Sequence, residues 1–234
     1  MTERLFEIEE NARRLLFEVS ETAIKNGRQP DEVRLMAVTK TNSAERVNSA
    51  IKGGITLLGE NRAQELLEKF DSYDKSDCDI HFIGHLQSNK VKAVIDKVTM
   101  IESVDRISLA KEIDRCAAAR GMIMPVLVEV NIGKEESKSG VAPEMLEEFL
   151  AQLSDFRSIK VMGLMTIPPN TDETAIKERY FAQMYRHFID IKAKKMDNVN
   201  MDILSMGMSH DFSLAIKHGS NIVRIGRGLF GERL

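Results

Sequence analysis

The chain of 234 residues lacks tryptophan and has only two cysteines, Cys78 and Cys116. Two cysteines are too few for a disulfide scaffold, and their spacing does not match the C-x-x-C pattern of metal and redox centres. Reduced thiols are typical of a reducing compartment, so we expect a cytoplasmic protein without disulfides. His81 and His85 stand on either side of Gly84 at the end of an apolar segment, and we expect no metal site there.

Long apolar runs and an excess of one charge are also absent. No run approaches the roughly 18 apolar residues of a membrane-spanning helix, and the charged N-terminal segment is unlike a signal peptide. The 33 Lys and Arg residues nearly balance the 36 Asp and Glu residues. This balance excludes a broadly basic surface of the kind that binds nucleic acid. We therefore expect neither a membrane nor a nucleic acid as a partner.

The chain does contain a regular alternation of short apolar segments and longer segments with helical spacing. A first helical segment runs from Leu5 to the stop signal at Asn26 and Gly27. Eight segments that we predict as strands follow it, at residues 34–39, 55–59, 80–84, 99–102, 125–130, 160–165, 202–205 and 221–225. A helical pattern follows each of these strands except the last.

Alternating strands and helices predict a parallel sheet with crossover helices, which is an α/β fold. Eight such units favour a single (β/α)₈ barrel of the TIM type over residues 1–234, with one extra N-terminal helix. The alternative is an open doubly wound sheet, which needs a topological switch point. Because the sequence shows no sign of such a point, we favour the barrel.

Lys40 directly follows the first predicted strand, on the face that strand alternation assigns to Met36 and Val38. An ammonium group held against apolar neighbours loses hydration, which lowers its pKa toward the value that a nucleophilic amine requires. A lysine that forms a Schiff base needs this property. The alternative is a lysine at the rim of the barrel that extends its ammonium group into water.

A glycine-rich segment follows the last predicted strand, where Gly226 to Gly231 read G-x-G-x-x-G. A dinucleotide-binding site would need a helix next and an acidic residue about 20 positions further on, which the remaining residues do not provide. We expect instead that backbone N–H groups bind a phosphate here, as barrels often do after their last strands. Residues 205–209 follow the neighbouring strand and could supply a hydroxyl group and a helix N-terminus to the same anion.

Arg224 interrupts the last predicted strand and shares a face with Ile222 and Gly226. A guanidinium group inside an apolar strand needs a partner or a ligand atom. A structural ion pair and a ligand contact are both open at this point.

Seven segments, which appear in order and span nearly the whole chain, resemble the pyridoxal-phosphate homeostasis protein family. They are residues 37–40, 59–61, 81–87, 135–140, 163–166, 205–209 and 223–226. This family is similar to the N-terminal barrel of alanine racemase, in the fold type III group of pyridoxal 5'-phosphate (PLP) proteins. The resemblance therefore implies a PLP-binding barrel that takes part in vitamin B6 homeostasis.

The resemblance also implies roles for individual residues. Lys40 would carry PLP as a Schiff base, Asn61 would lie beside the cofactor, and Arg224 would face the pyridine nitrogen. Ser209, Gly226 and the backbone of the next residue would hold the phosphate. An arginine that faces the ring nitrogen disfavours its protonation, which weakens the ring as an electron sink.

Two positions depart from the family pattern. Many relatives carry Ser or Thr where this chain has Arg227, although the charge of an arginine can also reach a phosphate. A tryptophan often precedes the His-Phe-Ile-Gly motif, where this chain has Ile80.

Two functional classes compete: a PLP carrier without turnover, and a PLP enzyme such as an amino-acid racemase. Alanine racemases need a second domain that supplies a catalytic tyrosine, whereas this sequence ends three residues after the glycine-rich segment. Tyr73, Tyr180 and Tyr185 all lie away from the predicted strand ends, so a two-base racemase would lack its second base. We favour the carrier. A barrel that acts on a phosphorylated metabolite without PLP is a third hypothesis.

The carrier hypothesis has three further parts. We expect Lys138, in the segment after the fifth predicted strand, to be a second amine for transient PLP capture. The other expected partners are apo forms of PLP-dependent enzymes, and we expect a monomer.

Overall fold

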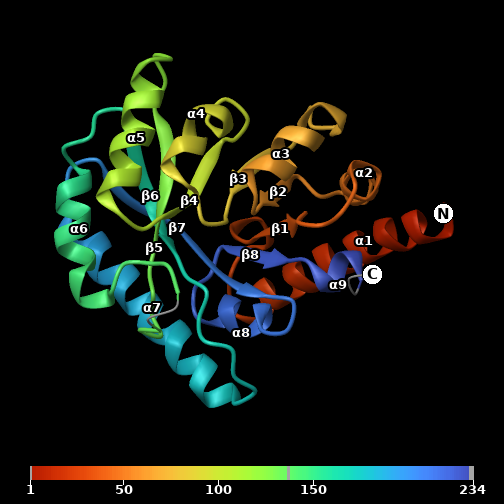
Figure 1. Cartoon of the computed structure of the whole chain (residues 1–234). Coiled ribbons are helices and arrows are strands. Elements are labelled where there is room, and N and C mark those ends of the chain that lie inside the picture. The colour runs from red at the N-terminus through yellow and green to blue at the C-terminus, as the bar shows by residue number, and fades with distance from the viewer. Residues whose placement is uncertain (1, 136–137, 232–234) are drawn as a thin grey trace.

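The computed structural model describes residues 2–135 and 138–231. Glu136 and Ser137 of the family-like segment 135–140, and residues 232–234, lie outside the described residues. Eight parallel strands form one closed barrel in sequence order (Figure 1). They are β1 (Arg34–Val38), β2 (Leu57–Glu60), β3 (Asp79–Phe82), β4 (Met100–Val104), β5 (Met124–Glu129), β6 (Ile159–Met165), β7 (Val199–Met208) and β8 (Ile222–Ile225).

The barrel closes through the pairing of its first and last strands, where Met36 of β1 lies opposite Arg224 of β8. On its other side β1 pairs with β2, and Val38 lies opposite Gly59. The predicted barrel is therefore confirmed, and the open doubly wound sheet is wrong.

Helices follow the strands around the outside of the barrel. They are α1 (Thr2–Lys25), α2 (Ala44–Lys52), α3 (Ala63–Lys69), α4 (Val91–Val94), α5 (Ile107–Ala118), α6 (Leu146–Leu153), α7 (Thr174–Lys194), α8 (Phe212–Lys217) and α9 (Arg227–Phe230). Short 3₁₀ helices occupy Pro30–Glu32, Phe70–Ser72, Ser88–Lys90 and Pro143–Met145. Within the described part of the chain, none of the helices combines the length and apolar character needed to span a bilayer.

The extra N-terminal helix, α1, packs along α2, α8 and α9. Its buried face repeats at helical spacing through Ile8, Ala12, Leu15 and Val19. A Cβ on Gly53 would lie 2.5 Å from the Cβ of Ala12, so only glycine allows this close approach of α1 to the end of α2. The predicted helix is confirmed.

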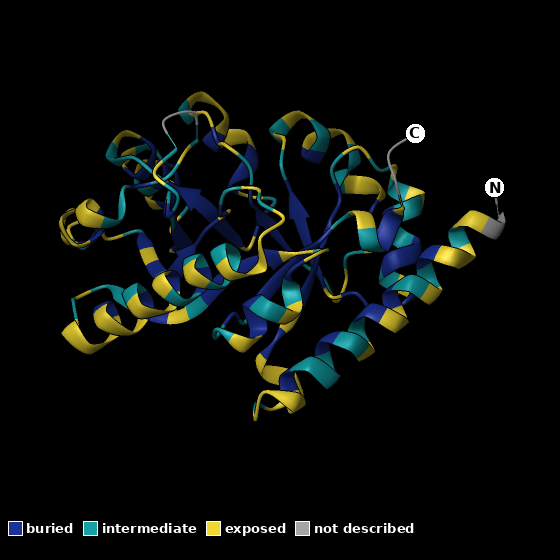
Figure 2. Ribbon diagram, turned by 90° about the horizontal axis from the view of Figure 1, so that it is seen from below, coloured by how far each residue is buried: buried dark blue, intermediate teal, exposed yellow. Residues whose placement is uncertain are grey.

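The apolar core has two layers, one outside the barrel and one inside it. Leu35 and Ala37 face the helices, whereas Met36 and Val38 belong to a cluster in the barrel interior. Figure 2 shows the result, with buried strands surrounded by helices that are buried on one side only. This alternation is the packing expected of a barrel whose interior is filled by side chains.

The segment 205–209, predicted as a loop, is mostly strand. β7 continues to Met208, which pairs with Arg224 across an irregularity in the register. Residues 209–211 then form a turn in which Asp211 Oδ1 accepts the N–H of Met208 at 2.7 Å. The helix predicted from Ser209 therefore begins only at Phe212.

The glycine-rich segment after β8 is also not simply a loop, because Arg227–Phe230 form the short helix α9. Glycine disfavours helices, but Leu229 and Phe230 are buried in the outer core. Side chains of α1 and α2 bind the end of the segment, since Asn11 Nδ2 donates to the Leu229 carbonyl at 3.3 Å and Arg46 donates to the Phe230 carbonyl. Tertiary packing here outweighs local propensity.

Candidate functional site

The carboxyl ends of β7, β8, β1 and β2 are consecutive around the barrel. The segments that follow these four strands contain Ser209, Gly226, Lys40 and Asn61. The Cβ that an alanine would place at position 226 would lie 3.5 Å from the Cβ of Val38, so the end of β8 lies against the end of β1. The structure therefore brings these four predicted residues to one side of the barrel mouth.

Lys40 lies in a turn two residues after β1, and its side chain is half-buried. Thr39, between the strand and the lysine, is fully buried and binds the Gly59 carbonyl through both its N–H and its hydroxyl, each at 3.1 Å. The strand pairing of β1 with β2 thus continues one residue further and fixes the point from which Lys40 leaves the barrel wall.

Asn61 directly follows β2, and its side-chain oxygen is buried without a hydrogen-bond partner among the described residues. An unsatisfied buried acceptor costs about 1–3 kcal/mol and points to a missing donor. Gly84 allows the backbone to pass close by, because a Cβ there would lie 2.0 Å from the Asn61 carbonyl oxygen. Asn61 therefore offers an acceptor to a ligand at the barrel mouth.

Arg224 is buried inside the barrel and donates two hydrogen bonds of 2.7 Å, from Nη1 to the Ser205 hydroxyl and from Nη2 to the Thr166 carbonyl. The Ser205 hydroxyl donates onward to Glu102 Oε2 at 2.6 Å. Glu102 Oε1 lies 2.6 Å from His81 Nδ1. The sequence left an ion pair and a ligand contact open for Arg224. Among the described residues, its direct partners are the Ser205 hydroxyl and the Thr166 carbonyl, and the Glu102 carboxylate lies one hydrogen bond further away.

In this chain of hydrogen bonds, Arg224 and Glu102 each favour the charged form of the other. Burial by itself would raise the pKa of Glu102, but the bond from His81 and the charge of Arg224 outweigh it and hold that pKa below its ordinary value. Burial lowers the pKa of Arg224, and nearby carboxylates, Glu102 first, oppose that shift. Since arginine stays protonated in proteins, Arg224 acts only as a donor.

Glu129, at the end of β5, is a second carboxyl group of unusual pKa. Burial first, and the negative charge of Asp105 second, raise its pKa to about 7, although the charge of Arg224 opposes the shift. This group therefore changes charge near neutral pH, close to the buried arginine.

Ser209 and the glycine-rich segment are joined directly, because the Gly228 N–H donates to Ser209 Oγ at 3.3 Å. Gly226 caps the start of α9, and Arg227 is the exposed first residue of that helix. The segments after β7 and β8 are in contact, as predicted. Of the two serines in the segment 205–209, Ser205 donates its hydroxyl to Glu102, so the hydroxyl expected for the anion is that of Ser209.

Lys138 lies across the barrel mouth from Lys40, in the segment after β5. Its ammonium group pairs with the Glu135 carboxylate and donates to the Pro168 carbonyl at 3.4 Å. Asn131 holds this segment through bonds from Nδ2 to the Glu135 and Lys138 carbonyls at 2.8 and 3.3 Å. The structure places Lys138 on the predicted rim but not beside Lys40.

Sequence reasoning missed Glu102, His81 and Thr166 as members of the buried hydrogen-bond chain. A signal existed for Glu102, which alternates with Met100 on the inward face of a strand that is apolar apart from Glu102 and Ser103. Nothing in the sequence could pair it with Ser205, because the two residues are 103 positions apart.

The fold and the site together define a barrel of the alanine racemase N-terminal class. The family model described as "Alanine racemase, N-terminal domain" matches residues 22–234. Alanine racemase from Streptomyces lavendulae shares this fold with a TM-score of 0.77 at 15% identity, over 98% of this chain and 58% of that chain. The likeness to this enzyme extends to the fold alone.

Relatives of higher sequence identity show which family within this class the chain belongs to. The pyridoxal phosphate homeostasis protein of Aquifex aeolicus is 41% identical over 96% of this chain and 97% of its own length. PipY of Synechococcus elongatus, solved with PLP bound, has a TM-score of 0.80 and 32% identity over 91% of this chain and all of that chain. The chain belongs to the pyridoxal phosphate homeostasis protein family.

Proposed function

We propose that this chain binds PLP at the carboxyl end of its barrel and carries it as a Schiff base on Lys40, as part of intracellular vitamin B6 homeostasis. The bond would form between the lysine amine and the aldehyde of PLP, with loss of one water. The observation that carries the proposal is the convergence of the segments after β7, β8, β1 and β2, which brings Lys40, Asn61, Ser209 and Gly226 together.

The residues present fit the cofactor. Asn61 supplies a buried acceptor that lacks a donor among the described residues. Ser209, Gly226 and the backbone of Arg227 would hold the phosphate, at a place where a hydroxyl and backbone N–H groups adjoin. Arg224 would face the pyridine nitrogen, and its guanidinium group is already fixed by two hydrogen bonds.

The guanidinium group of Arg224, which can only donate hydrogen bonds, favours a PLP carrier over a PLP enzyme. PLP supplies an electron sink when it is bound, and this capacity is greatest when its ring nitrogen is protonated. Arginine has no acceptor and does not give up its proton, so it can only donate to that nitrogen. A ring nitrogen that accepts from Arg224 stays unprotonated, which weakens the sink.

The names of two relatives support the proposal. PipY is a relative solved with PLP bound, and the Aquifex aeolicus relative is named for pyridoxal phosphate homeostasis. We further propose that this chain is a cytoplasmic, single-domain monomer that passes PLP to apo forms of PLP-dependent enzymes.

An amino-acid racemase is the alternative, and it would need a second base opposite Lys40. Tyr180 and Tyr185 lie in α7, and the Tyr73 hydroxyl donates to the Glu60 carboxylate. Tyr185 is exposed, but the Tyr73 hydroxyl lies at the end of β2, so the expectation that Tyr73 lies away from the strand ends is wrong. Burial first, and the charge of Glu60 second, raise the pKa of Tyr73 above its ordinary value, and a phenol that keeps its proton is a poor base, which favours the carrier. Racemisation of any of a panel of amino acids, lost in Lys40→Ala, would establish the enzyme instead.

Titration of the purified protein with PLP tests the proposal. A visible absorbance band should appear, and borohydride should fix PLP onto the Lys40 peptide, as detected by mass spectrometry. Lys40→Ala should show no such band. If PLP produces no band with the wild-type protein, the carrier and the racemase both fail, and a PLP-free barrel that acts on a phosphorylated metabolite becomes the better interpretation.

We also propose Lys138 as a second amine for transient PLP capture. Its position on the rim supports this role, and capture would require its ammonium group to leave Glu135 and give up a proton.

A further inference from the structure

The residue after Lys40 is held in a strained backbone conformation. Thr41 has a φ of +64°, in the left-handed region. Three other described non-glycine residues have positive φ, namely Lys134, Lys195 and Asn198, but Thr41 alone among these four is β-branched. A β-branched residue in this region is a genuine outlier, and such residues persist only when their surroundings hold them.

Helix α3 supplies the group that holds Thr41. The Thr41 N–H donates to Glu65 Oε2 at 2.8 Å, and this carboxylate is mostly shielded from solvent. Lys69, one turn further along α3, lies 3.6 Å from the same oxygen. A charge-assisted bond of this kind is stronger than one between neutral groups.

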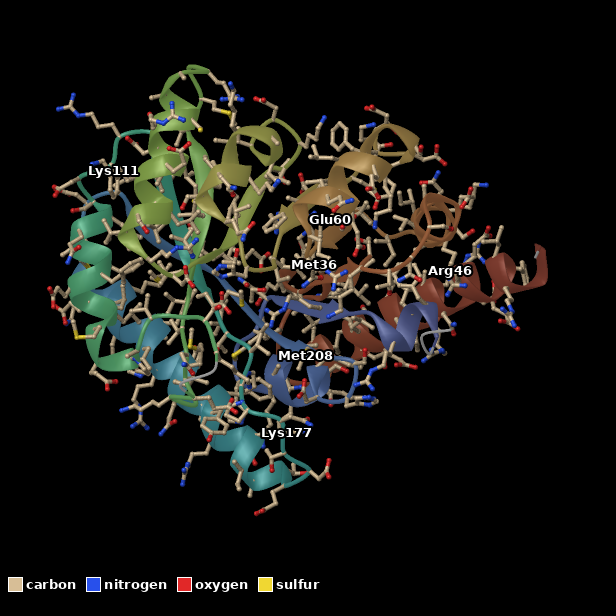
Figure 3. The ribbon with its side chains drawn as sticks, in the orientation of Figure 1. Met36, Arg46, Glu60, Lys111, Lys177 and Met208 are labelled. Carbon is tan, nitrogen blue, oxygen red and sulfur yellow. The ribbon has the colours of Figure 1, made fainter. Side chains whose placement is uncertain are left out.

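Lys69 also holds the residues on both sides of Lys40. Its ammonium group donates to the Thr39 carbonyl at 3.3 Å and to the Asn42 carbonyl at 3.4 Å. The side chain is only 14% exposed, and its charge is met by the fully buried Glu60 at 3.4 Å as well as by Glu65. Glu60, labelled in Figure 3, ends β2 just before Asn61.

Together these contacts fix the turn that presents Lys40. The lysine carbonyl accepts from Thr41 Oγ1 at 2.6 Å and from Asn42 Nδ2 at 3.1 Å. Backbone atoms before and after Lys40 are thus bound to α3, while the strained Thr41 would otherwise relax toward negative φ. Such a rotation at Thr41 would change the direction in which the neighbouring lysine leaves the turn.

We propose that Glu65 and Lys69 are positioning residues for PLP carriage: they hold Thr41 in its left-handed conformation and thereby direct the Lys40 amine toward the cofactor. This inference rests on the proposed function of Lys40. Neither residue needs to touch the cofactor, because both act on the backbone of the turn. The strain at Thr41 makes the presentation of Lys40 depend on α3.

The test compares four single variants, and Glu65→Ala combined with Thr41→Asn, with the wild type by PLP titration, borohydride trapping and mass spectrometry. Glu65→Ala removes the acceptor for the Thr41 N–H, and Glu65→Gln keeps an acceptor there. Glu68→Ala is the matched control, because Glu68 is exposed on the same helix, where its side chain accepts a hydrogen bond from Gln64 at 2.9 Å. Thr41→Asn relieves the strain, since asparagine tolerates the left-handed region.

We expect Glu65→Ala to weaken PLP binding about tenfold, which equals 1.4 kcal/mol, and Glu65→Gln to stay within about threefold of the wild type. Glu68→Ala should be unchanged. In the Thr41→Asn background, Glu65→Ala should weaken PLP binding less than about threefold. The reason is that an asparagine at position 41 adopts the left-handed conformation without the hydrogen bond to Glu65. In the apo proteins, limiting acetic anhydride should acetylate Lys40 faster in Glu65→Ala than in Glu68→Ala.

The outcomes separate this inference from the proposed function. If the wild type forms no Schiff base on Lys40, the proposed function fails. If the wild type does, but Glu65→Ala binds PLP like Glu68→Ala, the positioning role is wrong. An equal loss from Glu65→Ala with and without Thr41→Asn would also overturn it, since the strain would then play no part. Should Glu65→Ala not fold, Lys69→Met, which removes the donor to the Thr39 and Asn42 carbonyls, replaces it in the same two backgrounds with the same two outcomes.

Discussion

Arg224 and Glu102 face each other across one hydroxyl group. Ser205 Oγ lies 2.7 Å from Nη1 of the arginine and 2.6 Å from Oε2 of the glutamate. The hydroxyl donates to the carboxylate and accepts from the guanidinium group, so its orientation is fixed. In the part of the chain that the structure describes, the positive charge of Arg224 is therefore balanced without a direct ion pair.

Removing the bridging hydroxyl should destabilise the protein. Ser205→Ala takes one hydrogen-bond partner from the buried Arg224 and one from the buried Glu102, and we expect the free energy of unfolding to fall by about 2–3 kcal/mol. Urea unfolding measures this change. Ser103→Ala is the matched control, because its hydroxyl is also buried but has no partner among the described residues, so its loss should cost less than about 0.5 kcal/mol. Equal losses in the two variants would contradict the bridging role.

Glu102→Gln should change how stability depends on acid. The pKa of Glu102 in the fold lies below its ordinary value of 4.5, so its contribution is complete above that value and is lost as the pH falls through the folded pKa. We expect the variant to be about 3 kcal/mol less stable at pH 7, because it removes the carboxylate that most favours the charge of the buried Arg224. Urea unfolding should show this difference shrinking as the pH falls below 4.5. A difference that stays constant down to the acid transition would count against an ionised Glu102.

Glu129→Gln should raise the free energy of unfolding near neutral pH, whereas Glu102→Gln should lower it. The folded pKa of Glu129 is about 7 against an ordinary value of 4.5, so the fold binds a proton that the unfolded chain releases. The contribution of Glu129 to stability is therefore complete below pH 4.5 and is lost as the pH rises toward 7. Glutamine does not titrate, so the variant should gain about 3 kcal/mol relative to the wild type between these pH values. Parallel stability profiles of the two proteins would refute the raised pKa.

The proposed second amine can be tested through the rate of PLP release. Lys138→Ala should release PLP to an apo-enzyme at a changed rate while Lys40 still forms its Schiff base. Lys134→Ala is a control from the same segment, since Lys134 is exposed and pairs with Glu144 at 3.2 Å. If both variants release PLP like the wild type, Lys138 has no part in capture. Thermal unfolding of the apo proteins should change little, because an ion pair at the surface contributes at most about 1 kcal/mol and the Lys138 pair is only partly shielded from solvent.

Much of the architecture follows from local sequence pattern. The alternation of apolar segments and helical spacing predicts the barrel, because each strand must bury both faces and each helix one. Lys40 and Arg224 stand out in the sequence for the same reason, as charged residues at or in apolar strands. Except for β7, the strands begin and end within two residues of their predicted bounds, so the positions of Asn61 and Gly226 after strands are also correct.

The partners of these residues were decided only by the tertiary structure. Glu102 meets Ser205 from 103 positions away, and Glu65 reaches Thr41 from the helix after the next strand. Strand β7 runs past Ser205, and α9 forms although it contains Gly228, because pairing and packing with distant elements outweigh local propensity. Periodicity reports which face of an element is buried. It carries no information on which residue lies on the other side, since that depends on barrel closure and register.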